Sequence, residues 1–473
     1  MTVYRIMKIR SPETGNRIGH LFQRAIFSGL VLLVMIVLSR PQHALGEQTR
    51  YNLNDCYRMA LDRAEKIAIS KEDRVIAEYL REKALSVLIP RVSAVSSYRR
   101  YSEEKMIQDS VIQPGWDAAW GVTVGQQFTL NGREITGLRM AEDGIKKSQY
   151  DLNTVKEAYL LAVAATFFDV AKVHRGVEIA DANVQRLETY RNAVNTRLKL
   201  AEVTKTELFR TEAELSQAVA NRIRVKNLLL LALAELARLT GAPGDFRIDD
   251  IRISADAPVL PDLAVMKEKA LQNRAELKSL AMQEKIAANQ IRYNKGAYFP
   301  SIGVEGAWMR MGQDPSAIND ESIYFGIKLD VPIYDGGLRR AEVGEAEAQL
   351  RQVNLARSDQ ARQIEVEVEQ AWLNLSTQQS VITSFESQLL FARENYEAVT
   401  RLSQHGMANS VDVMDANTTL VTAERELAEA QYNLRLADLQ LKRAGGILLM
   451  DIEDKLKDAA STEHDAQPSI QGS

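Results

Sequence analysis

Apolar residues recur every seven positions near the C-terminal end of the chain. The first row consists of Val413, Leu420, Leu427, Leu434 and Leu441. Three positions behind it runs a row of alanines, namely Ala416, Ala423, Ala430, Ala437 and Ala444. A strict seven-residue repeat is typical of long helices that wrap around a partner in a left-handed supercoil. Leucine fills such an interface, and alanine lets the helix backbones approach closely.

The same two rows occur 205 residues earlier in the chain. The equivalent apolar positions are Leu208, Leu215, Arg222, Leu229 and Leu236, so only an arginine breaks the pattern. Gly132 likewise stands 205 residues before Gly337, whereas Pro90 and Pro300 are 210 residues apart. An internal repeat of this length indicates that one structural unit was duplicated, and we expect both copies to share one fold.

The placement of proline predicts where the long helices lie. There is no proline between Pro114 and Pro243, and none between Pro332 and Pro468. Both gaps are rich in residues that favour helix, and proline would break such a helix. Each gap contains one short polar break, so each is expected to fold as a long helix, a tight turn and a second long helix. The expected helices span residues 133–199, 206–240, 337–402 and 410–445.

Before each pair of long helices the pattern changes to strict alternation. In the second copy the apolar positions are Ile323, Phe325, Ile327, Leu329, Val331 and Ile333, with polar residues or glycine between most of them. In the first copy Trp120, Val122, Val124, Phe128 and Leu130 repeat this pattern. A period of two predicts strands with one apolar and one polar face. The expected strands span about 91–102, 117–130, 301–311 and 322–333.

These elements divide the chain into two repeats. The first covers residues 47–241 and the second residues 263–446, with a proline-containing linker at 242–262. Each repeat is expected to begin with a helix, at residues 54–88 and 263–293, followed by two strands and two long helices. Residues 451–473 are polar and end in a mixture of proline, serine and glycine, which predicts a disordered tail.

The first 46 residues have the pattern of a secretory signal peptide. A basic segment precedes an apolar run of 14 residues at 25–38, and Ala44 and Gly46 supply the small residues of a cleavage site. An uncleaved inner-membrane anchor is the alternative. The single cysteine, Cys56, excludes an intrachain disulfide, and we interpret it as a buried side chain of the first helix. The net charge of -4 includes no basic cluster, so no nucleic acid partner is expected.

Four strands are too few to close a membrane barrel. The smallest such barrels have about eight strands. Three copies of the chain would supply twelve, and two copies would supply eight but leave little lumen. A symmetric trimer with long helices continuing the barrel fits best, and a soluble sandwich of the four strands remains open.

Catalytic chemistry finds little support in the sequence. The chain has five histidines and one cysteine, and it contains no glycine-rich phosphate loop, metal-ligand spacing or nucleophile elbow. We therefore expect no enzyme activity, no catalytic residue, no metal and no cofactor.

Two segments of the second repeat resemble the TolC-like outer-membrane efflux protein family. They are residues 411–428, beginning VDVMDANTTL, and residues 332–337, PIYDGG. The similarity covers about residues 51–449. It implies a mainly α fold with a small membrane β-barrel: a homotrimer whose 12-stranded barrel sits in outer-membrane lipid and continues as a long α-helical barrel in the periplasm. The linker would then lie in an equatorial region.

The resemblance also implies a function and partners. Members of this family conduct substrates from an inner-membrane pump, through a periplasmic adaptor, to the exterior in tripartite efflux or type I secretion systems. The expected location is therefore the outer membrane of a Gram-negative type envelope, reaching into the periplasm. The alternative is a periplasmic coiled-coil adaptor or tether without a pore, which would explain the heptads but not the alternating strands.

Asp412 and Asp415 match the acidic pore ring of the family. They are three residues apart and therefore lie on one helical face. In a trimer they would place six carboxylates around one axis, which predicts a cation-selective constriction. The alternative is that both are solvated residues of a first helical turn, where acids suit the helix dipole. The first repeat has Glu207 and Arg210 at these positions.

The turns at the two ends of the long helices supply the remaining candidate residues. Gly406 is expected to permit the turn before residue 410. Adaptor docking, as implied by the resemblance, is expected around Gly406, Leu402, Ser403, Ala408, Val411, Leu198 and Thr204. The strand-to-helix turns are expected at Pro332, Asp335, Gly336, Gly337 and Gly132.

The chain also departs from the family pattern. Ser403 and Ala408 stand where the best-known member has a gate tyrosine and arginine, so those gate bonds cannot form from these side chains. Members of the family usually have Asn-Pro after the alanine-leucine pair of the first helix. Here Ala60 and Leu61 are followed by Asp62 and Arg63, so the start of the next turn is expected to differ.

Overall fold

The structure is a computed structural model that describes residues 50–108, 110–243, 246–249, 258–314 and 321–465. The chain divides into two units, Met1–Arg50 and Tyr51–Ser473. The expected signal peptide, residues 1–46, lies outside the described residues, as does part of the expected linker.

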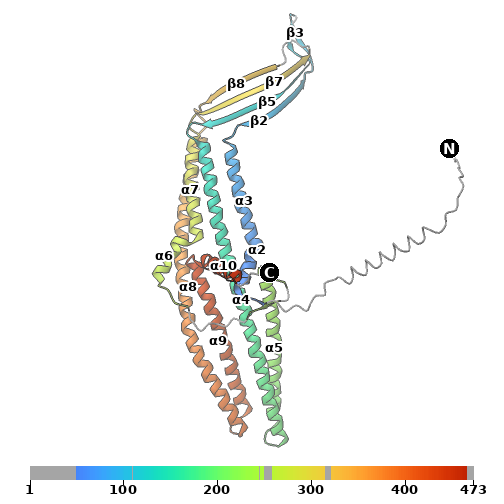
Figure 1. Ribbon diagram of the computed structural model, residues 1–473, viewed down its shortest axis with the longest axis vertical. Coiled ribbons are helices and arrows are strands. Elements are labelled where there is room, and N and C mark those ends of the chain that lie inside the picture. Colours follow the sequence, from blue (N-terminus) through green and yellow to red (C-terminus); the bar gives the residue numbers. More distant parts are fainter. Residues whose placement is uncertain (1–49, 109, 244–245, 250–257, 315–320, 466–473) are drawn as a thin grey trace, which may run out of the picture. The chain divides into compact units, whose positions relative to one another are not determined.

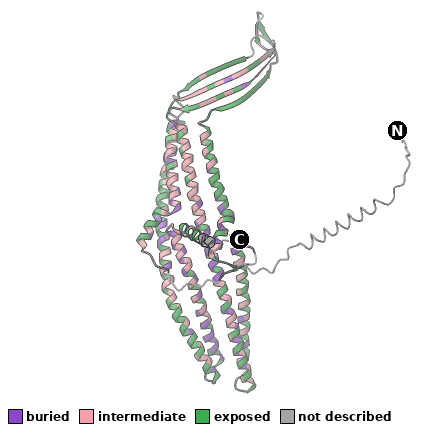
Figure 2. Cartoon of the chain, viewed as in Figure 1, coloured by how far each residue is buried: buried purple, intermediate pink, exposed green. Residues whose placement is uncertain are grey.

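Four long helices dominate the chain (Figure 1). The first pair is α4 (Arg133–Lys199) and α5 (Lys205–Thr240), and the second is α8 (Leu338–Gln404) and α9 (Ser410–Ala444). Within each pair the helices pack along each other, and α4 also packs against α9. All five heptad alanines of α9 are buried, as are four of the five residues in its apolar row, which explains why the sequence keeps this spacing. Figure 2 shows buried, intermediate and exposed residues alternating along the long helices.

The helices that open each repeat are broken, contrary to the expected continuous helices. The first is divided into α2 (Leu53–Arg63) and α3 (Glu65–Ser86), and the second into α6 (Leu263–Asn273) and α7 (Ala275–Gly296). The residues at the breaks, Ala64 and Arg274, have extended backbones with ψ near +122°. They are 210 residues apart, the same shift that separates the two prolines before the strands.

The four expected strands form one antiparallel sheet rather than two separate hairpins. Its order is β2 (Arg91–Arg100), β5 (Trp116–Thr129), β7 (Ser301–Asp314) and β8 (Glu321–Asp330). The loop between β2 and β5 contains a small hairpin, β3 (Lys105–Ile107) and β4 (Ser110–Gln113), that the sequence pattern did not predict. The two-residue strands β1 (Arg50–Tyr51) and β6 (Arg247–Ile248) complete the set.

The register of the sheet places its apolar residues on one face. Val122 pairs with Ala94 on one side and with Trp308 on the other, and Trp308 pairs with Ile323. The rings of Trp120 and Trp308 meet edge to face at 5.0 Å on this face. Much of the face is exposed in the single chain, with Ile323 77% and Phe325 73% accessible. Among the described helices, none is long and apolar enough to cross a membrane.

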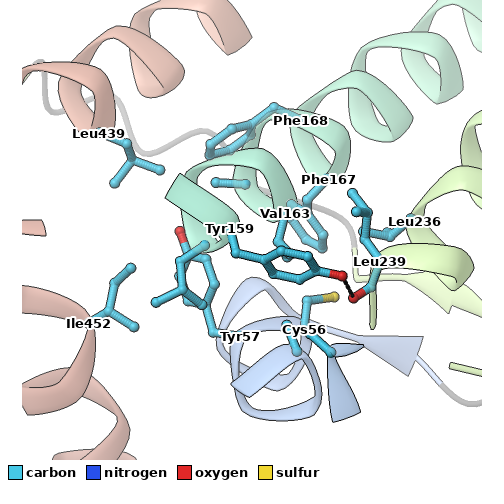
Figure 3. Close-up of a cluster of buried hydrophobic side chains, with 14 of the residues drawn as sticks. Cys56, Tyr57, Tyr159, Val163, Phe167, Phe168, Leu236, Leu239, Leu439 and Ile452 are labelled. Carbon is cyan, nitrogen blue, oxygen red and sulfur yellow. Dashed lines mark hydrogen bonds between the residues drawn. The ribbon is translucent and has the colours of Figure 1, made fainter. Parts of the chain in front are cut away.

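The largest buried cluster within the described residues joins α2 and residues 448–452 to the middle of α4 (Figure 3). Cys56 is 1% exposed in this cluster, which confirms the expectation that it is buried. The buried hydroxyl of Tyr159, on α4, donates a hydrogen bond to the carbonyl oxygen of Leu239 at 2.9 Å, so it has an acceptor inside the apolar cluster.

A C-terminal helix, α10 (Leu448–Asp465), corrects the expectation of a disordered tail from residue 451. Leu448 and Ile452 are one helical turn apart and are buried in the cluster of Cys56, and Leu456 packs against it. This i, i+4, i+8 stripe is what makes the polar segment helical. Residues 466–473 of the expected tail lie outside the described residues.

Candidate functional site

The turn between α8 and α9 is built by a left-handed glycine. Gly406 has a φ of +71°, as its expected role in the turn requires. Its amide donates to the carbonyl of Ser403 at 3.1 Å, and the amide of Met407 donates to the carbonyl of Leu402 at 2.9 Å. These two bonds satisfy the last carbonyls of α8 in the manner of a Schellman motif.

The start of α9 is fixed by a capping box. The side chain of Asn409 accepts from the amides of Val411 and Asp412, at 2.7 and 3.2 Å. In return the carboxylate of Asp412 accepts from the amide of Asn409 at 2.9 Å. Two amides of the first turn and the amide of the cap thereby find acceptors.

Asp412 and Asp415 are both exposed and follow one another on the same face of α9. Val413 and Met414, which lie between them, are buried against α4 and α5. Asp412 therefore lies in the first turn of α9, as the alternative interpretation has it, and it also takes part in the capping box. That role uses one of its two carboxylate oxygens, and the side chain of Asp415 takes no part in the cap, so an acidic ring remains a prediction.

The other predicted residues of these turns are divided between surface and interior. Leu402, Val411 and Thr204 are exposed, and Ala408 and Leu198 are half-buried. Ser403, by contrast, is only 2% exposed. The adaptor-docking role of this set stays a prediction, with Ser403 the member least able to contact a partner.

Ser403 is held by two residues that the sequence pattern did not single out. Arg197 of α4 donates from Nη1 to the carbonyl of Ser403 at 2.8 Å. The hydroxyls of Tyr190 and Ser403 lie 3.4 Å apart. A tyrosine and an arginine are thus present near this turn, but α4 supplies them instead of α8, and 206 residues separate Arg197 from its acceptor.

The strand-to-helix turn after β8 is organised by a carboxylate. Asp335 accepts from the amide of Gly337 at 3.1 Å and from Nε of Arg339 at 2.6 Å. Gly336 and Gly337 both have positive φ, +71° and +95°. Arg339 also donates to the carbonyl of Pro332 at 3.0 Å and so closes the turn. Gly132, the equivalent of Gly337, has the same left-handed conformation before α4, with φ at +71°.

The polar face of the sheet is lined by charged and small residues. Where the strands meet the helices, a depression of about 500 Å³ opens on this face. Its ionisable lining consists of Arg91, Glu305, Lys328 and Asp330. The sheet therefore has one apolar face and one face that carries charged residues.

A buried charge cluster surrounds the second helix break. Arg274 is 2% exposed, and it donates two bonds of 3.0 Å to Glu276, one of 2.9 Å to Glu367 and one of 3.3 Å to the carbonyl of Ala444. Arg443 adds a second cation, 3.8 Å from Glu276.

Glu157 of α4 faces this cluster and is 5% exposed. Burial raises the pKa of Glu157 to about 7, and the nearby charge of Glu276 adds to the rise, while Arg274, Arg443 and the amide of Leu449 oppose it. Its helical neighbours alone gave no signal that this glutamate is buried. Within the described ranges, no group of three or more histidine, cysteine or acidic residues could hold a metal ion.

Comparisons with known proteins agree with this geometry. The family model described as "Outer membrane efflux protein" matches residues 267–446. The outer membrane protein TolC of Escherichia coli (strain K12) is 23% identical over 431 residues, which is 87% of this chain and 86% of that protein. The alkaline protease secretion protein AprF of Pseudomonas aeruginosa is 21% identical over 442 residues, covering 90% of this chain and 89% of AprF.

Solved structures share the fold. CusC, described as forming a transmembrane channel, superposes with a TM-score of 0.76 at 16% identity, covering 86% of this chain and 95% of CusC. The outer membrane protein VceC of Vibrio cholerae gives a TM-score of 0.72 at 17% identity over 83% of this chain and 96% of VceC. The resemblance of this chain to the TolC-like outer-membrane efflux proteins is therefore confirmed, and its mostly helical fold is that of solved outer-membrane channels.

Proposed function

We propose that this chain is the outer-membrane channel of a tripartite efflux or type I secretion system. The observation that carries the proposal is the two-faced sheet, in which four antiparallel strands present an exposed apolar face and a charged face. Such a sheet suits a wall between lipid and an aqueous lumen. The match to the family model described as outer membrane efflux protein and the relative named for protease secretion support a conduit, and they do not favour a periplasmic adaptor or tether.

The sheet supports a trimer because its edge strands are unpaired within the described chain. Strands β2 and β8 each have one neighbour in the sheet. Within lipid an open edge is not tolerated, since its amides and carbonyls have no water to bind. Three chains, pairing β2 of one with β8 of the next, would close a barrel of twelve strands. In this assembly each chain would contribute the duplicated unit of a helix, two strands and two long helices.

Exposed apolar residues on the long helices agree with side-by-side packing of chains. Helix α5 exposes Leu228, Leu230 and Leu231, and α8 exposes Leu355, Leu390 and Phe391. These side chains lie on single helices that have no partner on that side within the described chain. Burial against a neighbouring copy would remove them from water and would continue the barrel as a helical tube.

The turns after α4 and α8 would form the periplasmic end of this tube. There Asp412 and Asp415 would face the axis as a ring of carboxylates that favours cations. The exposed turn residues Leu402, Val411 and Thr204 would meet the adaptor, which in turn connects the channel to an inner-membrane pump. The role of the chain would be conduction, with no catalytic step and no cofactor.

Conductance in a planar lipid bilayer tests the channel directly. We expect the purified protein to migrate as a trimer in mild detergent and to open cation-selective pores. A monomeric protein that never conducts, at any voltage or salt concentration, would rule out the proposal.

A matched set of variants tests the acidic ring separately from the channel. Asp415→Asn keeps the shape of the side chain and leaves the capping box intact, and with Asp412→Asn it removes all six charges. We expect the double variant to lose most of its cation selectivity and its block by divalent cations. Glu207→Gln, at the equivalent position of the first repeat, is the control and should keep both. Equal selectivity in all proteins would refute the ring while leaving the channel in place.

A further inference from the structure

A cavity of about 410 Å³ lies between α4 and α8 near the helix turns. Its volume is within the range of 300–1,000 Å³ that is usual for small-molecule sites. The α4 side of the lining comes from residues 182–197 and the α8 side from residues 396–404. Two tyrosine rings, Tyr190 and Tyr396, and the small residues Ala182, Ala193 and Val194 form its apolar surface.

Two arginines of α4 mark the two ends of this cavity. Arg186 makes a two-fold contact with the carboxylate of Glu424 on α9, at 3.2 and 3.0 Å. Arg197 donates to the carbonyl of Ser403 at 2.8 Å, and its Nε lies 3.5 Å from Glu202. Each guanidinium is therefore fixed by the protein through part of its donor set, and each remains in the cavity lining.

Several buried donors at this site lack an acceptor. Within the described part of the chain, Nε of Arg186 and Oγ1 of Thr400 are inaccessible to solvent and have no hydrogen-bond partner, and Nε of Arg197 has only the 3.5 Å ion pair with Glu202. All three residues line the cavity. A buried donor without an acceptor is costly, so a rotation of these side chains toward the acceptor atoms of a ligand would recover that loss.

The side chains that line the cavity favour an anionic ligand with an aromatic ring. Its polar members are guanidiniums, hydroxyls and amides, and none of the described lining residues is acidic. The carboxylates that balance the two arginines, Glu424 and Glu202, belong to the surroundings and not to the lining. An anionic group would meet donors on every polar side, and a flat ring would pack against the tyrosines.

We propose that this cavity is a binding site for a small anionic aromatic molecule, such as an aryl carboxylate, bridging α4 and α8. The acid would accept from Arg186 or Arg197 and from Thr400, and the ring would lie between Tyr190 and Tyr396. The two helices belong to different hairpins, α4–α5 and α8–α9. A ligand that touches both therefore stabilises the arrangement in which the hairpins stay together. If the chain is the proposed channel, this ligand reduces opening at the helix turns.

Isothermal titration of the full-length protein in lipid nanodiscs with 2-naphthoate tests the site. The neutral isostere 2-naphthamide is expected to bind at least ~10-fold more weakly, because it loses the charge-assisted bonds. Ala193→Trp fills the cavity and should abolish 2-naphthoate binding, whereas Asn192→Trp, an exposed neighbour outside the lining, should not. Thr400→Val removes one donor while keeping the shape, and should weaken binding about three- to ten-fold.

Each result supports or overturns a defined part of the proposal. Binding that Ala193→Trp leaves unchanged, or equal binding of acid and amide, means adventitious binding only and overturns the site. If the affinities follow the expected order but 2-naphthoate does not change the conductance, the binding site is supported and the proposed effect of the ligand on channel opening is overturned. Because the titration does not depend on conduction, a protein that binds the acid but never conducts would refute the proposed function and not the site.

Discussion

The two helix breaks, at Ala64 and Arg274, have nearly the same backbone conformation but opposite surroundings. Each lies beside the glycine that ends a long helix, since a methyl group on Gly241 would meet the side chain of Arg63 and one on Gly446 would meet the backbone of Arg274. Both glycines have a φ of +68°. The first break is buried in an apolar cluster with Ile67 and Tyr159. The second is buried in a network of ions.

This difference shows that one backbone geometry can be stabilised by two kinds of chemistry. An apolar cluster loses stability in proportion to the volume that a substitution removes. An ion network loses more when its buried central member is removed, since the partners lose their charge-assisted bonds; here Arg274 is 2% exposed, and its partners Glu276 and Glu367 are 20% and 42% exposed. The second break should therefore be the more sensitive of the two to substitution and to pH.

The largest effect is expected for Arg274→Met. The substitution keeps most of the apolar stem but leaves Glu276 and Glu367 without their guanidinium, so we expect a loss of about 3 kcal/mol in the free energy of unfolding. The matched control at the first break is Arg63→Met. Its side chain is exposed and donates one bond to the carbonyl of Gly241 at 3.0 Å, so its loss should be below about 1 kcal/mol. Thermal unfolding followed by circular dichroism gives both values, and equal losses would contradict the comparison.

The sequence contains enough information for the long helices but not for these breaks. The proline-free gaps and the heptads predict helices of the length that α4 and α8 have, 67 residues each. Ala64 and Arg274 are ordinary helix formers, and nothing local requires a break there. Each break lies against a glycine more than 170 residues later in the chain, Gly241 for the first and Gly446 for the second. Such a contact leaves no periodic signal.

In the candidate site, too, contacts between residues close in sequence could be predicted, and contacts between distant segments could not. Asn409 and Asp412 form a capping box that is visible in the sequence, because both partners lie within four residues. The pair of Arg197 and Ser403 could not be predicted, because it joins two hairpins. The apolar stripe of α10 was detectable, but the polar residues around it outweighed it.

The stability of the region around the second break is expected to depend on pH through Glu157. Glu157→Gln replaces a carboxyl whose pKa is raised to about 7 by burial and by Glu276. The folded protein therefore binds a proton that the unfolded chain releases near pH 4.5. This group contributes stability that is fully present below about pH 4.5 and is lost as the pH rises toward 7. The glutamine stays neutral, and its carbonyl can still accept from the amide of Leu449.

We expect Glu157→Gln to be more stable than the parent by about 2 kcal/mol at pH 8, with the difference shrinking toward pH 5. The groups that face Glu157 are Glu276 on α7, Arg274 at the break and Arg443 on α9, with Lys278 and Glu453 lining the adjacent cavity. Glu453→Gln is the control, because that side chain is 43% exposed and pairs with Lys156 at 3.8 Å. Melting temperatures of the three proteins between pH 5 and 8 decide the matter. Parallel curves for the parent and Glu157→Gln would show that the carboxyl is not buried as described.

The turns after α4 and α8 are a second pair of equivalent positions in the two repeats, with similar backbones and different residues. Ala201 and Gly406 are 205 residues apart, and both are left-handed, with φ of +61° and +71°. The amide of Ala201 donates to the carbonyl of Leu198 at 3.0 Å, as that of Gly406 does to Ser403. The following helix starts also differ, because Asn409 caps α9 with its side chain and Thr204 makes no such bond to α5. The first turn thus has the same helix-ending bonds as the second, but with alanine in place of glycine and without a side-chain cap on the next helix.

The smallest effect is therefore expected for exchanging these two residues. Ala201→Gly removes the strain of a side chain at positive φ and should raise stability by about 0.5–1 kcal/mol, after the larger entropy of glycine in the unfolded chain is allowed for. Gly406→Ala should lower stability by about 1 kcal/mol, and through its φ alone, because a methyl group there would meet only the end of Arg197 at 4.0 Å. Thermal melts of the two single variants and of the double exchange measure these effects. If both substitutions lower the free energy of unfolding, Ala201 causes no backbone strain in the turn after α4. The two turns then differ in more than the residue at positive φ. If the signs are opposite, the first turn carries strain that the second avoids, and the weaker of the two hairpin ends is the one between α4 and α5.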